Sequence, residues 1–242
     1  MKNNDLHEGK NVCTNEIVWI KNGVPHRTNG PAITHRLGYS AWYFEGNKHR
    51  VDGPAVEYLN GDKEWWLNGE RHRDDGPAYI EQDGDMEWWI NDKLHRDAAP
   101  AVIKNNGTKE WYQHGQLHRE GGPAIEYENG DYEYYHNGLL HREDGPAIRL
   151  ENGREYWYRF GTLHREDGPA VITDYGTKYY QNGLLHREDG PSVQIEDRPL
   201  QWHINGVEYT EAQFYELRIK MTLIETHQLS IANNSEHVKK KI

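Results

Sequence analysis

A His-Arg pair returns at a fixed interval through most of this 242-residue sequence. The step between pairs is 23 residues six times and 22 residues once. A constant period of this length is typical of repeat proteins, in which each unit packs mainly against its neighbours. The eight pairs are His26-Arg27, His49-Arg50, His72-Arg73, His95-Arg96, His118-Arg119, His141-Arg142, His164-Arg165 and His186-Arg187.

Two further elements keep the same period. A Gly-Pro-Ala element follows most of the His-Arg pairs, from Gly30-Pro31-Ala32 to the variant Gly190-Pro191-Ser192. A pair of ring-bearing residues, here called the first and second aromatic, follows in turn. These pairs are Trp42-Tyr43, Trp65-Trp66, Trp88-Trp89, Trp111-Tyr112, Tyr134-Tyr135, Trp157-Tyr158, Tyr179-Tyr180 and Trp202-His203. Because all three elements share one period, we take the repeat as the folding unit.

Each repeat predicts a β-hairpin. In the second repeat a short run at residues 55–58 is followed by Asn60-Gly61, and a run at residues 64–67 is followed by Asn68-Gly69. Asn-Gly between aromatic or β-branched runs indicates a tight hairpin turn, because both residues tolerate positive φ. Runs this short are not helices. We therefore expect an all-β repeat solenoid: an elongated, twisted antiparallel sheet of stacked β-hairpins with a C-terminal capping helix.

The repeat also predicts the domain boundaries. We expect a flexible N-terminus over residues 1–15 and an array of eight His-Arg repeats with partial caps over 16–209. A capping helix over 210–228 and a polar tail over 229–242 complete the chain. The helix is predicted from Thr210-Glu211-Ala212-Gln213, which fits a capping box. Its apolar residues at helical spacing are Phe214, Leu217, Met221 and Ile224.

Strand alternation assigns the two faces of the sheet. The residue after each Gly-Pro-Ala or Gly-Pro-Ser element is apolar or aromatic, for example Val56 and Tyr79. We expect this residue on the same face as the first aromatic. The second aromatic then points to the opposite face, with the small alanine, and the His-Arg loop folds over it.

Composition supports a thin, aromatic core and a protein partner. The sequence has 16 Tyr and 9 Trp but only 3 Phe, with a mean hydropathy of -1.05, so large rings must replace aliphatic side chains. The formal net charge of -11 argues against nucleic acid and anionic membranes as ligands. Cys13, the single cysteine, excludes an intrachain disulfide. The first ten residues are polar, so we expect no signal peptide and a cytoplasmic location.

The repeat resembles the MORN repeat, a 23-residue β-hairpin unit. In residues 66–72 (Trp-Leu-Asn-Gly-Glu-Arg-His) the aromatic, Asn-Gly and His lie where that motif has them. MORN units continue with His-Gly-x-Gly, whereas this chain has His-Arg-x-Asp-Gly-Pro-Ala. It is therefore similar to a divergent MORN-like class found in predicted phage and giant-virus proteins. The resemblance implies an interaction scaffold. Some MORN arrays are linked to phosphoinositides, which the negative charge here disfavours.

The His-Arg ladder does not predict an enzyme. His72-Arg73-Asp74 matches the kinase catalytic-loop triplet, but no phosphate-binding loop or Asp-Phe-Gly accompanies it. Equivalent histidines should lie about 9–10 Å apart, two strand spacings, which is too far for ligands of one metal ion. We expect no catalytic residue, cofactor or metal. The arginines are expected to pair with loop aspartates, as in Arg50 with Asp52.

Two neighbouring repeats depart from the pattern. Repeats four and five lack the aspartate that precedes the glycine in most other repeats, which leaves Arg96 and Arg119 with fewer local partners. Two interpretations remain open: sequence drift in a loop, or a contact site for a partner. The second aromatics Trp66, Trp89 and Tyr112 are further candidates for partner binding, because interfaces are rich in such residues.

The sequence therefore favours a non-enzymatic repeat scaffold that binds another protein, as a viral or phage accessory factor acting on a host protein would. The alternative is an acidic nucleic-acid mimic that occupies a DNA-binding protein. A row of glutamates would serve the mimic: Glu64, Glu87, Glu110 and Glu133.

Overall fold

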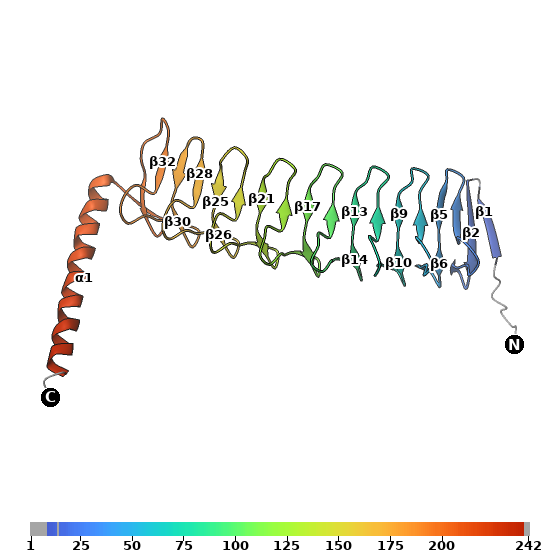
Figure 1. Cartoon of the computed structure of the whole chain (residues 1–242), viewed down its shortest axis with the longest axis horizontal. Helices are drawn as coiled ribbons and strands as arrows, with labels where there is room; N and C mark the ends of the chain where they lie inside the picture. Colours follow the sequence, from blue (N-terminus) through green and yellow to red (C-terminus); the bar gives the residue numbers. More distant parts are fainter. Residues whose placement is uncertain (1–8, 14, 240–242) are drawn as a thin grey trace. The chain divides into compact units, whose positions relative to one another are not determined.

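The computed structural model describes residues 9–13 and 15–239. The fold is mostly β: an 18-stranded antiparallel sheet built of repeated hairpins, followed by one C-terminal helix (Figure 1). The predicted fold class is confirmed. The chain divides into two units that meet between Leu139 and Leu140, and each is described by itself.

In the first unit the main sheet is a ladder of antiparallel neighbours in chain order. Most of its strands are only two residues long. Its strands are β1 (Gly9–Cys13), β2 (Glu16–Lys21), β3 (Val24–Pro25), β4 (Ile33–His35), β5 (Tyr39–Ala41), β8 (Val56–Glu57), β9 (Lys63–Glu64), β12 (Tyr79–Ile80), β13 (Met86–Glu87), β16 (Val102–Ile103), β17 (Lys109–Glu110), β20 (Ile125–Glu126) and β21 (Tyr132–Glu133).

The second unit continues the same design. Its main-sheet strands are β24 (Ile148–Arg149), β25 (Glu155–Tyr156), β28 (Val171–Thr173), β29 (Gly176–Lys178) and β32 (Val193–Ile195). The hairpin of β33 (Trp202–Ile204) and β34 (Val207–Tyr209) ends the repeats. The helix α1 (Glu211–Lys239) follows it directly.

Each repeat forms a second, smaller hairpin that the sequence pattern does not separate from the first. The strands of these small hairpins are β6 (Tyr43–Phe44), β7 (Asn47–Lys48), β10 (Trp66–Leu67), β11 (Glu70–Arg71), β14 (Trp89–Ile90), β15 (Lys93–Leu94), β18 (Tyr112–Gln113), β19 (Gln116–Leu117), β22 (Tyr135–His136), β23 (Leu139–Leu140), β26 (Tyr158–Arg159), β27 (Thr162–Leu163), β30 (Tyr180–Gln181) and β31 (Leu184–Leu185). The turn between β10 and β11 has Asn68 at φ 53° and Gly69 at φ 89°. Consecutive positive φ values favour Asn-Gly and match the twist of the strands.

The predicted assignment of faces is wrong by one residue. Tyr79, the residue after Ala78, pairs across the sheet with Glu64 and Glu87, not with a first aromatic. Cross-strand partners share a face, and the indole of Trp66 donates a hydrogen bond to Glu64. The residue after the alanine therefore lies with the second aromatic. The error is one of register, since a shift of one residue exchanges the two faces.

Each His-Arg pair is tied, through its histidine ring, to the small hairpin that follows it in the sequence. In all eight pairs Nδ1 accepts a backbone N–H from the first turn residue of the next small hairpin. These donor–acceptor pairs, at N–Nδ1 distances of 3.0–3.3 Å, are Glu45–His26, Asn68–His49, Asn91–His72, His114–His95, Asn137–His118, Phe160–His141, Asn182–His164 and Asn205–His186. The histidine ladder therefore connects successive small hairpins.

Both ends of the chain differ from the predicted boundaries. Residues 9–13, placed in a flexible N-terminus, form strand β1, whereas residues 1–8 lie outside the described residues. At the other end Gln213 N–H donates to Thr210 Oγ1, and Thr210 N–H donates to Gln213 Oε1, which confirms the capping box. The helix continues to Lys239, so most of the expected polar tail is helical.

The helix covers the last hairpin only with its beginning. Phe214 is fully buried, and α1 contacts β33 and β34. Ile224, from the same predicted stripe, is 58% exposed. The capping role is therefore restricted to the first turns of α1.

A single glycine accommodates the shortened seventh repeat. Gly176 has φ 144°, and a Cβ at this residue would overlap the carbonyl oxygen of Gln194 in the neighbouring strand. No side chain fits so close to the backbone. The 22-residue step thus depends on a glycine at this position.

Replacing His49 by Phe should cost about 1 kcal/mol of unfolding free energy, because the ring remains but the acceptor for the Asn68 N–H is lost. Urea unfolding measures the change. Hydrogen exchange of the Asn68 amide should accelerate, whereas the Asn91 amide, held by His72, should keep its protection. Equal exchange of the Asn68 amide in both proteins would contradict the assignment.

Gly176→Ala should destabilise the second unit by about 2–4 kcal/mol, because the new Cβ meets the Gln194 carbonyl. Gly153→Ala is the matched control. Gly153 also has a positive φ, of 83°, but nothing lies within 4 Å of the position that a Cβ would take there. Thermal unfolding of the two variants separates the clash from the backbone preference; equal losses would rule out the clash.

Candidate functional site

Arginines of the His-Arg loops stack on the aromatic ring that lies eight residues before them in the sequence, as Arg27, Arg50, Arg73, Arg96, Arg119, Arg165 and Arg187 do. In the third loop the Arg73 guanidinium lies 4.2 Å from the ring centre of Trp65. Its Nη1 donates to the Pro77 carbonyl, and its Nε donates to Asp75 Oδ1 at 2.8 Å. The loop therefore folds over the first aromatic, not over the second as predicted.

The expected arginine–aspartate pairs are confirmed in five loops. They are Arg50–Asp52, Arg73–Asp75, Arg142–Asp144, Arg165–Asp167 and Arg187–Asp189, with Nε–Oδ1 distances of 2.6–3.0 Å. The hydrogen bond from the guanidinium holds the pKa of each aspartate below its ordinary value. These carboxylates nevertheless remain exposed to solvent, and the side chain of Asp75 is 84% exposed.

The two irregular loops have a different backbone as well as a different sequence. Ala98 has φ 54° and Gly121 has φ 75°, at the position where the regular loops carry aspartate. Ala98 is the one non-glycine residue with positive φ in the described His-Arg loops. Left-handed backbone is unfavourable for alanine, so the fourth loop is strained.

The two irregular arginines differ from each other. Arg96 lies 3.9 Å from the ring centre of Trp88 and donates Nη1 to the Pro100 carbonyl. Burial lowers its pKa. Arg119 makes the same kind of contacts, with Trp111 and the Pro123 carbonyl, and also pairs with Glu126. Arg96 therefore has no carboxylate partner among the described residues, whereas Arg119 has one.

The second aromatics on the other face are held by the glutamate row. The indoles of Trp66 and Trp89 donate to Glu64 and Glu87 at 2.6 and 2.8 Å. The hydroxyl of Tyr112 donates to Glu110 at 3.0 Å, and Tyr135 donates to Glu133 at 2.8 Å. Each glutamate directly precedes the aromatic pair of its repeat, so the acceptor and the ring that it orients come from the same strand end.

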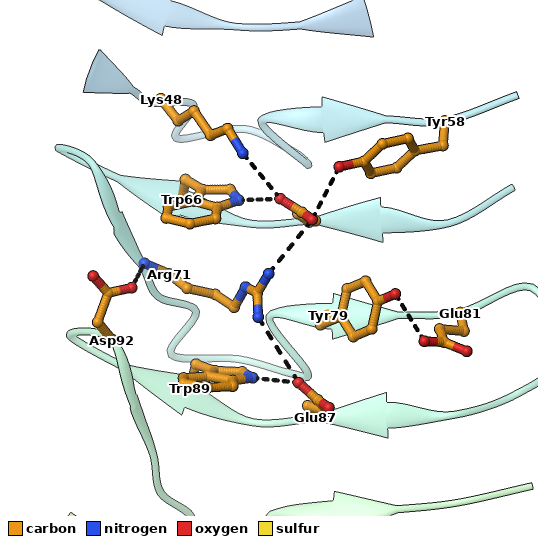
Figure 2. A network of polar contacts seen from close by, with 10 residues as sticks. Lys48, Tyr58, Trp66, Arg71, Tyr79, Glu81, Glu87, Trp89 and Asp92 are labelled. Carbon is orange, nitrogen blue, oxygen red and sulfur yellow. Dashed lines mark hydrogen bonds and ion pairs between the residues drawn. The ribbon is translucent and has the colours of Figure 1, made fainter. Parts of the chain in front are cut away.

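Cations link neighbouring rings on this face. Figure 2 shows Arg71 between Trp66 and Trp89, with its guanidinium 5.2 and 5.0 Å from the two ring centres. Arg71 also reaches Glu64 at 3.4 Å, and Lys48 binds the same carboxylate. Where later repeats have leucine, such as Leu94 and Leu117, Lys48 and Arg71 make the first repeats charged.

The candidate residues do not form one site. Arg96 and Arg119 lie over first aromatics, whereas Trp66, Trp89 and Tyr112 belong to the opposite face, because consecutive residues in extended backbone point to opposite sides. Sequence reasoning missed the role of the glutamates as acceptors for the second aromatics. The position of glutamate immediately before the aromatic pair in four consecutive repeats was the available signal.

The glutamate row is not an exposed surface. Glu64 is only 7% exposed, and its two oxygens accept hydrogen bonds from Tyr58, Trp66, Lys48 and Arg71. This row is therefore a structural network. The His-Arg loops, by contrast, carry exposed carboxylates such as Asp74 and Asp97.

Shallow grooves separate successive loops. One groove in the first unit is lined by Arg50, Asp52, Trp65, Arg73 and Asp75. A groove with equivalent residues lies between the loops at 142–144 and 164–167 in the second unit. At the rims the carboxylates are more exposed than the arginines that they pair with, as in Asp75 and Arg73, whose side chains are 84% and 24% exposed. We call the exposed surface of the first-unit loops at 50–54, 73–77, 96–100 and 119–123 the loop ridge.

Comparison with known proteins identifies no family. No family model matches the chain, and no curated protein matches it. In the described part of the chain, no group of three or more His, Cys, Asp or Glu side chains is arranged to hold a metal ion. Among the same residues, no helix has the length and apolar character that crossing a membrane requires.

Buried tyrosines on the glutamate face should titrate late. Burial, together with nearby carboxylates, raises the pKa of Tyr58 and of Tyr127 to about 12, from an ordinary value of 10.0. Since the folded state favours the neutral phenol, stability is intact below pH 10 and falls as the pH rises toward 12. Ultraviolet titration of phenolate measures this, and Tyr58→Phe should remove part of the late component. A chain whose tyrosines all ionise near pH 10 while folded would contradict the packing.

Proposed function

We propose that this chain is a non-enzymatic repeat scaffold that binds a protein partner along the loop ridge. The observation that carries the proposal is that one group of polar side chains bonds to other residues of the fold, whereas a second group faces solvent. The histidines, the paired arginines and the glutamate row make contacts within and between repeats. The loop carboxylates, by contrast, project into solvent: Asp74 and Asp97 are 87% and 93% exposed.

Periodic carboxylates beside ring-floored grooves suit a partner with basic side chains. Exposed charges steer association and fix orientation more than they add affinity. We also propose that the chain is related to the MORN-like repeats. The same proposal includes a role as a viral or phage accessory factor that acts on a host protein, and a cytoplasmic location.

A charge-neutralised ridge tests the proposal. The variant Asp74→Asn, Asp97→Asn, Glu120→Gln changes three loop carboxylates that make no ion pair with arginine. The matched control is Glu70→Gln, Asp83→Asn, Glu128→Gln, which changes three exposed carboxylates of the hairpins, outside the His-Arg loops, by the same charge. A partner captured by the unmodified chain should bind the ridge variant at least about tenfold more weakly and the control unchanged.

Equal affinity for all three proteins would contradict the ridge as the binding surface. Competition with duplex DNA separates the scaffold from the nucleic-acid mimic. The partner of a mimic is released by duplex DNA, because the two occupy the same basic surface. We expect duplex DNA to leave the complex intact.

A further inference from the structure

A periodic ridge has a physical problem of register. Successive loops lie about 9–10 Å apart, two strand spacings. A partner that recognises only the repeated carboxylates gains almost the same contacts after sliding by one repeat. A break in the period is therefore needed to fix one position. In the first unit this break is the fourth loop.

The regular loops show what the fourth loop lacks. In five loops the guanidinium Nε donates to an aspartate oxygen two residues later, for example Arg73 to Asp75 at 2.8 Å. In the fourth loop this position is Ala98, and the described partners of Arg96 are the Trp88 ring and the Pro100 carbonyl. The loop of Arg27 also has no carboxylate at this position, but it keeps the polar Asn29 there.

The neighbouring loop makes Arg96 distinct. Arg119 has no aspartate in its loop either, but its Nη1 pairs with Glu126 of the adjacent strand β20, so its guanidinium charge has a carboxylate partner. The residue that corresponds to Glu126 in the fourth repeat is Ile103. Neither the loop nor the strand therefore offers Arg96 an acceptor. A guanidinium stacked on an indole with an unpaired Nε edge is preorganised for a carboxylate.

The backbone of the fourth loop supports a functional role. Ala98 keeps a φ of 54°, which alanine adopts only at a cost. Ala99 replaces the glycine that packs against the guanidinium in the other loops, as Gly76 packs against Arg73. The irregularity is thus concentrated around one arginine.

We infer that Arg96 binds a carboxylate side chain of the partner, which takes the position that Asp75 and its equivalents occupy in the regular loops. This inference rests on the proposed scaffold function and specifies its register. Exposed carboxylates flank the position, including Asp74, Asp97 and Glu120. The partner segment accordingly carries an acidic residue with basic residues about one loop step away on either side.

A peptide pair tests the site without the natural partner. The probe is the end-blocked peptide Lys-Gly-Gly-Glu-Gly-Gly-Lys, in which three extended residues span about 10 Å. Its control replaces Glu by Gln. The glutamate peptide should bind the full chain about tenfold more tightly, as expected for a charge-assisted hydrogen bond, and should shift the Nε–Hε resonance of Arg96 but not that of Arg73.

Ala98→Asp supplies the carboxylate internally and should abolish the preference for the glutamate peptide, whereas Ala98→Asn should retain most of it. Aspartate at this position is the regular state of five loops, so the variant is expected to fold, and thermal unfolding checks it. Absence of a glutamate preference in the unmodified chain, including absence of binding, overturns the inference. A preference that persists in Ala98→Asp overturns it as well.

The natural partner separates this inference from the proposed function. Ala98→Asp should weaken capture of the partner by about tenfold. A partner that tolerates Ala98→Asp but is lost from the charge-neutralised ridge removes the carboxylate site and leaves the scaffold. A partner that ignores both sets of changes removes the ridge itself.

Discussion

The structure depends on contact between successive repeats, because a hairpin with two-residue strands forms too few hydrogen bonds to be stable alone. Each His-Arg pair supplies an acceptor for the next small hairpin through its histidine Nδ1, as His49 does for the Asn68 N–H. Arginines of these pairs stack on the aromatic ring eight residues before them, as Arg73 does on Trp65. Hydrogen bonds and ring contacts thus replace the aliphatic core that the composition does not provide.

This arrangement gives many of the polar and ionisable side chains a structural role. The histidine and arginine recur in all eight repeats, and the glutamate recurs in four consecutive repeats, where these side chains bond to neighbouring parts of the fold. Glu64 is an example, since its carboxylate is buried and bonded by four neighbours. Repeats differ from one another in residues that the contacts between successive hairpins do not require. The proposed binding function therefore depends on departures from the repeat consensus.

The sequence predicted the repeat, the antiparallel hairpins, the arginine–aspartate pairs and the capping box, because each is encoded by local spacing. The prediction failed where register matters. Tyr79 is expected on the face of the first aromatic, but its cross-strand partners are Glu64 and Glu87. Local alternation fixes which residues of one strand share a face, yet it does not fix which residues they meet on the next strand. That depends on the geometry of the turn.

The candidate site shows the same limit. The sequence shows that the aspartates beside Arg96 and Arg119 are missing. It does not show that Arg119 pairs with Glu126, since those two residues meet only when the loop is folded. The predicted extent of α1 is also too short, because its later residues lack a continuous apolar stripe.

Gly176 has a consequence for how such a chain can change over evolutionary time. The missing residue of the seventh repeat is absorbed within one hairpin, where Gly176 approaches Gln194, and the His186–Asn205 junction downstream keeps its geometry. Length variation is thereby confined to the hairpin ends, while the junctions continue undisturbed. Chains of this architecture can lose a residue from a hairpin and keep the contacts between hairpins, provided that glycine occupies the position where the shortened hairpin approaches its neighbour, as Gly176 does.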